Sequence, residues 1–198
     1  MSADEPFRWI LVVGFAAVMP VGLYHRIRSQ ATGESLNRRH EGWFILVALR
    51  PVGIASMLGT LAFMIRPTWM AWSQLPLSVA VRWCGVPLGV ATAALLISVF
   101  RSIGDNITDT VVTRKQHQLV THGPYRYVRH PLYTATLLGA LANGLVTANW
   151  FIAATGLTAF TLLMTRSRTE ERFLIERFGD DYRQYRNRTG SVFPKLGD

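Results

Sequence analysis

The chain has 198 residues, of which 49% are hydrophobic and only 17% are charged. Soluble domains carry about 25% charged residues, so this composition indicates a membrane protein. The formal net charge is +9, but the basic residues are separated by long apolar runs, which excludes the continuous basic surface of a nucleic-acid-binding protein. The single cysteine, Cys84, excludes an intrachain disulfide and a thiolate metal cluster.

Apolar segments in the first half of the chain predict membrane-spanning helices. A helix needs about 20 apolar residues to cross a bilayer. Three segments approach or exceed this length: residues 8–25, 42–65 and 80–100. Asp4 and Glu5 stand where a signal peptide carries positive charge, so we interpret the first segment as a span and not as a leader.

Arg50 and Pro51 interrupt the second predicted span. An arginine at the middle of a span costs about 2.5–3.5 kcal/mol on insertion scales. We therefore expect its side chain to face the protein interior or a water-filled cleft. A structural kink, with the guanidinium bound by carbonyl groups, and a contact with a ligand both fit this pattern.

Residues 131–165 contain no charged residue. As a single helix this segment would be roughly 50 Å long, more than the roughly 30 Å of a bilayer core. Asn143-Gly144 and Asn149 favour a turn, so we predict two further spans, 131–147 and 150–165. Small residues that allow close helix contact occur in both: Gly139, Ala140, Ala142, Gly156 and Ala159.

The tail, residues 166–198, is the most charged part of the chain. Its apolar residues recur at helical spacing: Phe173, Leu174, Phe178, Tyr182 and Tyr185. This pattern predicts an amphipathic helix that lies against the membrane or the rest of the domain. The fold class we predict is therefore an all-α integral membrane protein, one domain of residues 1–198 with five transmembrane helices and a cytoplasmic C-terminal amphipathic helix.

The distribution of basic residues predicts the orientation. The 25–42 loop holds four, the 101–130 loop holds five and the tail holds eight, whereas the segments on the other side share only three. Cytoplasmic segments are enriched in Lys and Arg, so the N-terminus is expected outside and all three basic segments inside. The preference for Arg over Lys favours a GC-rich bacterial genome, and hence a bacterial inner membrane.

Within the 101–130 loop and the start of the next span, the stretch HQLVTHGPYRYVRHPLY (117–133) gathers three histidines, two arginines and three tyrosines. Gly123-Pro124 and His130-Pro131 disfavour a continuous helix, and Pro131 can be the first residue of a new one. A solvated linker would not need so many aromatic and imidazole groups. We interpret it as a binding loop.

Arg166 and Glu170 follow the last predicted span and, being four apart, share one helix face. An exposed ion pair at this spacing stabilises a helix by only about 0.2–0.5 kcal/mol. At the membrane boundary, however, a partly desolvated guanidinium can bind a carboxylate through two N–H groups. A surface ion pair and a functional site both remain open at this point.

The stretch GPYRYVRHPLY (123–133), followed after a helix pair by RSRTEERFLIERFGDDYRQY (166–185), resembles the isoprenylcysteine carboxyl methyltransferase family and the wider group of integral-membrane methyltransferases. The RHPxY, EE and FG-x-x-Y-x-x-Y elements match in order and spacing, over residues 100–196. The resemblance implies a cytoplasm-facing enzyme that binds S-adenosylmethionine without a Rossmann fold and methylates a carboxylate of a lipidic, isoprenylcysteine-like substrate.

The resemblance also implies site residues. The family's cofactor contacts would fall on His117, Gln118, Leu119, Val120, Tyr125, His130, Pro131, Leu132, Tyr133 and Glu170. Arg166 would bind the substrate, and Arg166 and Glu170 would carry the catalysis. No metal is implied. The partners implied are the membrane and a lipid or lipidated small-molecule substrate, with no nucleic acid.

The residue chemistry is compatible with this assignment. Leu119, Val120 and Leu132 can line an apolar slot for adenine, while His130 and Glu170 can bind the amino-acid end of the cofactor. A carboxylate acceptor is ionised at pH 7 and needs no base, whereas an amine acceptor needs one.

Alternatives remain open. The acceptor can be another lipidic carboxylate, a phospholipid amine or a small thiol. An NADPH-dependent membrane reductase of the sterol-reductase type shows a similar RHPxY element and tail. A non-enzymatic structural or assembly-factor membrane protein is the third reading.

Overall fold

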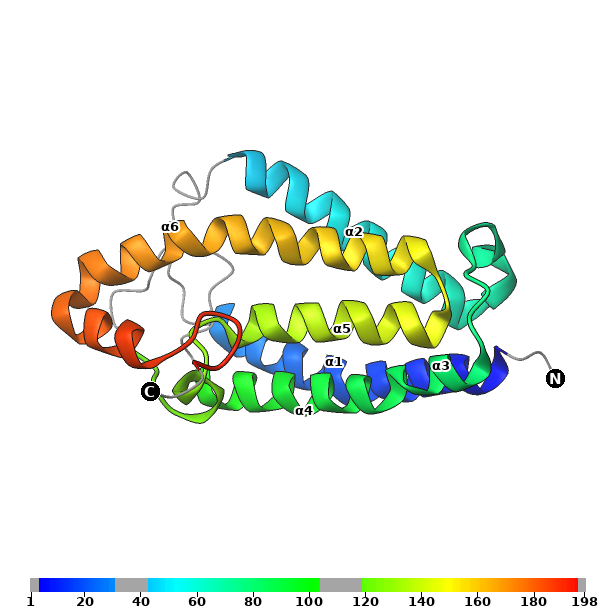
Figure 1. Cartoon of the computed structure of the whole chain (residues 1–198), viewed down its shortest axis with the longest axis horizontal. Helices are drawn as coiled ribbons and strands as arrows, with labels where there is room; N and C mark the ends of the chain where they lie inside the picture. Colours follow the sequence, from blue (N-terminus) through cyan, green and yellow to red (C-terminus); the bar gives the residue numbers. More distant parts are fainter. Residues whose placement is uncertain (1–3, 31–42, 104–118, 196–198) are drawn as a thin grey trace.

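The computed structural model describes residues 4–30, 43–103 and 119–195. Apart from two isolated bridges, the regular structure in these residues is helical, which confirms the predicted all-α class. The elements in chain order are α1 (Glu5–Gln30), α2 (Trp43–Ile65), η2 (Pro67–Ser73), α3 (Val79–Trp83), α4 (Gly85–Ile103), η4 (Gly123–Arg126), α5 (Pro131–Thr147) and α6 (Trp150–Arg188). The long helices run along a common direction and make an elongated molecule (Figure 1).

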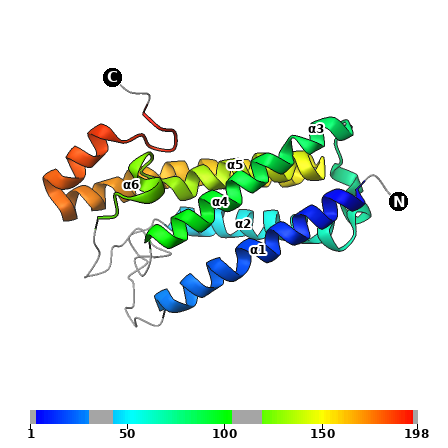
Figure 2. The ribbon, with the colours of Figure 1, turned by 90° about the horizontal axis from the view of Figure 1, so that it is seen from below.

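Helix α5 lies between α4 and α6 and packs against both (Figure 1). Helix α6 also packs against α2, and α1 packs against α4 (Figure 2). Small residues set the approach of α5 and α6, because a Cβ atom added at Gly156 would lie 2.7 Å from Cβ of Ala140. The sequence thus allows the close helix contact expected for this pair.

By length and composition, three segments in the described part of the chain can cross a membrane: Glu5–His25, Val47–Ile65 and Val79–Ser102. Large apolar side chains on all three are exposed, as contact with lipid requires, among them Val13, Ile54 and Val90. Helix α5 has 17 residues and would be roughly 26 Å long at the usual helical rise. Spans formed by α5 and the first part of α6 stay a prediction.

One of the two alternatives for Arg50, a place in the protein interior, was wrong. Its side chain is exposed on α2 and does not face the protein interior. Arg50 is the eighth of the 23 residues of α2, which begins at Trp43. Its place in a water-filled cleft stays a prediction.

The C-terminal helix also differs from the prediction, because it is not a separate element. Helix α6 continues from the predicted fifth span into the charged tail and changes direction at Gly179, whose backbone has φ 55° and ψ −123°. Beyond this bend the chain folds back toward the start of α5 (Figure 1). The bend brings Tyr182 and Tyr185, both buried, against residues 119–130, which precede α5 and which we call the connector.

At the end of the molecule away from the Gly179 bend, buried polar contacts join several segments of the chain. The side chain of Asn149 accepts the N–H of Ile152 at 3.1 Å, capping α6, and donates to the Met70 carbonyl at 3.1 Å. Arg82, which is 3% exposed, pairs with Asp4 at 2.8 Å and donates to the Val146 carbonyl. The start of α1, the η2 turn and the α5–α6 turn are therefore joined at this end.

Candidate functional site

The RHP segment is fixed by the end of the chain. Residues 189–193, which we call the C-terminal strap, run beside the connector, and Val128 and Gly190 form a parallel bridge. The N–H of Arg129 donates to the Gly190 carbonyl at 2.9 Å, and the N–H of His130 donates to the Ser191 carbonyl at 3.0 Å. Because both bonds are to backbone, they set the position of the connector independently of the strap's side chains.

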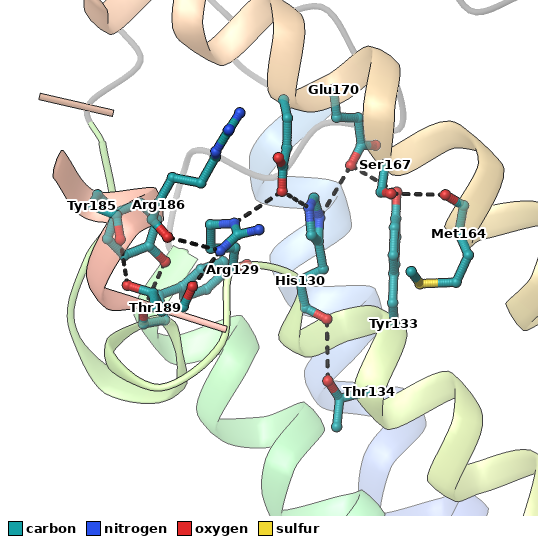
Figure 3. A network of polar contacts seen from close by, with 12 residues as sticks. Arg129, His130, Tyr133, Thr134, Met164, Ser167, Glu170, Tyr185, Arg186 and Thr189 are labelled. Atoms are coloured by element: carbon teal, nitrogen blue, oxygen red, sulfur yellow. Dashed lines mark hydrogen bonds and ion pairs between the residues drawn. The ribbon is translucent and has the colours of Figure 1, made fainter. Parts of the chain in front are cut away.

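Helix α5 begins at Pro131, as the sequence predicts, with His130 as its N-cap. This start places two side chains of the RHPxY element together. The imidazole of His130 and the ring of Tyr133 stack with their centroids 5.0 Å apart and their planes 13° from parallel. Both side chains point toward α6 (Figure 3).

Glu170 on α6 contacts both His130 and Tyr133. The hydroxyl of Tyr133 donates to Glu170 Oε2 at 2.7 Å, and His130 Nδ1 lies 3.5 Å from the same oxygen. Arg166 Nε lies 2.9 Å from the other oxygen, Oε1. The side chains of Arg166 and Glu170 are only 12% and 20% exposed, so this is not an exposed surface ion pair.

The neighbouring carboxylate, Glu171, forms a second set of contacts. Its Oε1 lies 3.2 Å from His130 Nε2 and accepts the Nε–H of Arg129 at 2.9 Å. The guanidinium of Arg129 also donates to the carbonyls of Arg186, at 3.1 Å, and Thr189. The two glutamates of the EE element are thus linked through one imidazole.

These contacts shift the titration of the groups. Burial opposes a charge on His130, but its hydrogen bonds to Glu170 and Glu171 outweigh this effect and raise the pKa of His130. Burial likewise disfavours ionised Glu170, and contact with His130 and Arg166 overcomes it and lowers the pKa of Glu170. For Glu171, His130 and Arg129 overcome the desolvation and lower the pKa to about 2. These contacts therefore favour the ionised carboxylates and the protonated imidazole.

The structure brings together several of the residues expected at the site. His130, Tyr133, Arg166 and Glu170 are in direct contact. The carbonyl of Tyr125 accepts the hydroxyl of Tyr185 at 2.7 Å, which ties Tyr125 to the end of α6. Pro131 is buried at the start of α5, while Leu132 is 42% exposed, and Leu119 and Val120 are half-buried. His117 and Gln118 lie outside the described residues.

The sequence analysis did not assign Arg129 to the site, and Glu171 was considered only as a possible base for an amine acceptor. Each is adjacent to an expected residue, in the pairs Arg129-His130 and Glu170-Glu171. These two pairs of adjacent ionisable residues were the sequence feature that could have indicated Arg129 and Glu171. What the sequence did not show is that the two pairs contact each other, because they belong to segments about 40 residues apart.

Sequence comparison matches residues 85–176 to the Isoprenylcysteine carboxyl methyltransferase (ICMT) family. Over 84 residues, 42% of this chain and 38% of the relative, it is 43% identical to the cobalt-zinc-cadmium resistance protein CzcN of Cupriavidus metallidurans. Over 83 residues, 41% of this chain and 35% of the relative, it is 38% identical to the protein-S-isoprenylcysteine O-methyltransferase of Schizosaccharomyces pombe. It is also 36% identical over 70 residues, 35% of this chain and 24% of the relative, to methanethiol S-methyltransferase 1 of Bradyrhizobium diazoefficiens.

The matched segment therefore spans well under half of each of these three relatives. Among solved structures, the fold is similar to that of the eukaryotic intramembrane Ras methyltransferase ICMT, with a TM-score of 0.55 and 21% sequence identity. That similarity covers 94% of this chain and 68% of the solved chain, and it concerns the fold alone. Residues 85–176, which hold α4, the connector, α5 and the RHPxY and EE elements, thus match the isoprenylcysteine carboxyl methyltransferase family.

Proposed function

We propose that this chain is an integral-membrane methyltransferase that transfers the methyl group of S-adenosylmethionine to a carboxylate of a lipidic, isoprenylcysteine-like substrate. The observation that carries this proposal is the convergence of the RHPxY and EE elements on Glu170, which contacts Tyr133, His130 and Arg166. These two elements lie in the segment that matches the family, and they form one buried polar cluster.

The proposal includes five membrane spans, with α5 and the first part of α6 as the fourth and fifth. The polar cluster lies at the opposite end of the molecule from the start of α1 (Figure 1). With the N-terminus outside, as the distribution of basic residues predicts, the cluster faces the cytoplasm, where a water-soluble methyl donor is present.

The residues present fit the donor's amino-acid end. Glu170 offers an ionised carboxylate to its ammonium group. His130 and the first N–H groups of α5 offer donors to its carboxylate, since a helix N-terminus attracts anions. Tyr125, Leu119, Val120 and Leu132 supply aromatic and apolar surface for the adenine.

Arg166 is the residue we assign to the acceptor. Glu170 keeps the hydroxyl of Tyr133 as a partner if Arg166 is drawn away, so it can exchange the guanidinium for the ammonium of the donor. The guanidinium can then bind a planar acceptor carboxylate through two parallel N–H groups. Donor binding would in this way prepare the acceptor site.

A carboxylate acceptor requires the protein to position and desolvate it, but not to deprotonate it. Held by His130 and Glu170, S-adenosylmethionine would supply an electrophilic methyl group on a sulfonium, and the leaving group would be a neutral thioether. The acceptor is ionised at pH 7, so no base is required. The residues of the cluster orient the acceptor and exclude water from it.

Binding of S-adenosylhomocysteine and of NADPH to the detergent-solubilised protein, measured by isothermal calorimetry, tests the proposal. We expect S-adenosylhomocysteine to bind and NADPH not to bind. Binding of NADPH alone would support a reductase. Binding of neither, together with full function of His130→Ala and Glu170→Ala in the host, would support a non-enzymatic role.

A thiol acceptor is the second candidate, because one of the relatives is a methanethiol S-methyltransferase. A thiol must lose its proton before it attacks, and the lowered pKa values of Glu170 and Glu171 make both glutamates weak bases for this step. Incubation of membranes with methyl-labelled S-adenosylmethionine separates the two acceptors. Label that alkali releases as methanol indicates a methyl ester, whereas alkali-stable label indicates a thioether.

A further inference from the structure

The imidazole of His130 lies between two carboxylates, with Nδ1 3.5 Å from Glu170 Oε2 and Nε2 3.2 Å from Glu171 Oε1. The residue is only 6% exposed, so water has little access to it. A neutral imidazole has one N–H and one lone pair, so it would turn a lone pair toward one carboxylate. Only the doubly protonated ring offers a donor to both.

The two carboxylates are not equivalent. Glu171 is fixed by Arg129, at 2.9 Å, and Arg129 is itself anchored on the carbonyls of Arg186 and Thr189. Its contact with the imidazole is also the shorter one. Glu171 therefore orients the ring, and the Nδ1 side is left with a long contact to Glu170.

Other groups around His130 make a protonated ring consistent with the cluster's charge. Arg129 faces it across Glu171, Arg166 faces it across Glu170, and Tyr133 stacks on it without adding charge. Tyr125 and Tyr182 lie further away within the same electrostatic environment. With His130 protonated, the three cations exceed the two carboxylates by one charge, which suits the binding of an anion.

We propose that Glu171 is a positioning residue that holds His130 as an imidazolium and directs its Nδ1–H toward the carboxylate of the donor's amino-acid end. Glu170 then accepts the ammonium of the same amino-acid group, so that each glutamate of the EE element has a separate task. This inference rests on the proposed function, because the ligand it names is S-adenosylmethionine or its product.

The pH dependence of ligand affinity tests this role. The full chain in detergent is titrated with S-adenosylhomocysteine between pH 6 and 9, as wild type, as Glu171→Gln and as the control Glu176→Gln, which alters an exposed carboxylate on the same helix. Loss of one neighbouring carboxylate should lower the pKa of His130, because its hydrogen bond and charge favour the imidazolium. We expect the affinity of Glu171→Gln to stay within about threefold of wild type at pH 6 and to be about tenfold weaker at pH 8.5.

A purely structural role of Glu171 would weaken binding by the same factor at every pH, and that result would overturn the inference. A Glu171→Gln profile identical to wild type would overturn it as well. The control should follow the wild-type profile throughout.

A measurement on wild type alone keeps the inference testable if Glu171→Gln does not fold. In protein labelled with ¹⁵N-histidine, with the His130 signals assigned by their loss in His130→Gln, we expect both ring nitrogens to carry protons at pH 7.5 without ligand. A neutral His130 would reject the inference even if S-adenosylhomocysteine binds. Failure of wild type to bind S-adenosylhomocysteine would instead reject the proposed function, and the two failures are therefore distinguishable.

Discussion

At the scale of single residues, the site depends on how the charge of Glu170 is shared. Its oxygens contact a guanidinium, a phenol and an imidazole that come from two segments of the chain. Hydrogen bonds to an ionised group are worth about 1.5–3 kcal/mol each, roughly twice a neutral one. Several such partners let a largely buried carboxylate stay ionised and still exchange one partner for a ligand.

Removing the hydroxyl of Tyr133 tests whether Glu170 depends on several partners, and it changes only one atom group. In Tyr133→Phe the 2.7 Å hydrogen bond to Glu170 is lost, while the ring that stacks on His130 remains. We expect the affinity for S-adenosylhomocysteine to fall about tenfold, corresponding to about 1.4 kcal/mol. Tyr127→Phe, which changes an exposed tyrosine of the same connector, is the control and should bind like wild type. Equal binding by both variants would contradict a role of this hydroxyl in holding Glu170.

Arg166 should affect turnover more than donor binding. In Arg166→Ala, Glu170 keeps Tyr133 and His130, so the affinity for S-adenosylhomocysteine should stay within about threefold of wild type. Without the guanidinium the acceptor is not held in line, and turnover in membranes with labelled S-adenosylmethionine should fall by about 100-fold or more. Arg168→Ala, an exposed arginine two positions on, should be nearly unchanged. Parallel loss of both quantities in Arg166→Ala would show that Arg166 serves the donor and not the acceptor.

At the scale of elements, local sequence patterns predicted where helices begin, but they did not predict which distant segments contact each other. Uncharged length and turn residues indicated where α5 and α6 begin, and Pro131 indicated the start of α5. The reversal at Gly179 was missed because the helical spacing of apolar residues continues through FGDDY, and one glycine in such a pattern is usually tolerated in a helix. The pairing of the strap with the connector was missed because it joins backbones of segments about 60 residues apart.

Gly179 is the residue on which that reversal depends. Its φ of 55° with ψ −123° is open to glycine and strained for any residue with a Cβ, although no atom lies within 4 Å of a Cβ built there. Gly179→Ala should therefore cost about 1–3 kcal/mol through backbone strain alone. Thermal unfolding in detergent measures this as a Tm lower by about 2–4 °C for each kcal/mol.

The control for that prediction is Gly14→Ala in α1, where the glycine has equal open space but an ordinary helical backbone. Alanine is the better helix former, so this variant should be as stable as wild type or slightly more so. Because the bend positions the strap beside the connector, Gly179→Ala should also weaken S-adenosylhomocysteine binding, and Gly14→Ala should not. Equal Tm values for the two variants would mean that the bend carries no strain.

At the scale of the whole molecule, polar clusters occupy the two ends of an apolar bundle. One end holds the His130–Glu170–Glu171 cluster, and the other holds the contacts of Arg82 with Asp4 and of Asn149 with Met70. The positive excess lies at the first end, in the connector and the tail. This asymmetry is what predicts the orientation, since apolar length alone is the same in both directions.

The orientation can be measured with two exposed glutamines, Gln74 near the η2 turn and Gln184 beyond the bend of α6. In a Cys84→Ser background, Gln74→Cys and Gln184→Cys each leave one cysteine in the chain. A membrane-impermeant maleimide applied to intact cells, or to spheroplasts of a bacterial host, should label Gln74→Cys directly and Gln184→Cys only after permeabilisation. The reverse result would place the polar cluster outside, away from the cytoplasmic pool of S-adenosylmethionine, and would contradict the proposed function together with the orientation. Labelling of both before permeabilisation would show that the two ends do not lie on opposite sides of one membrane.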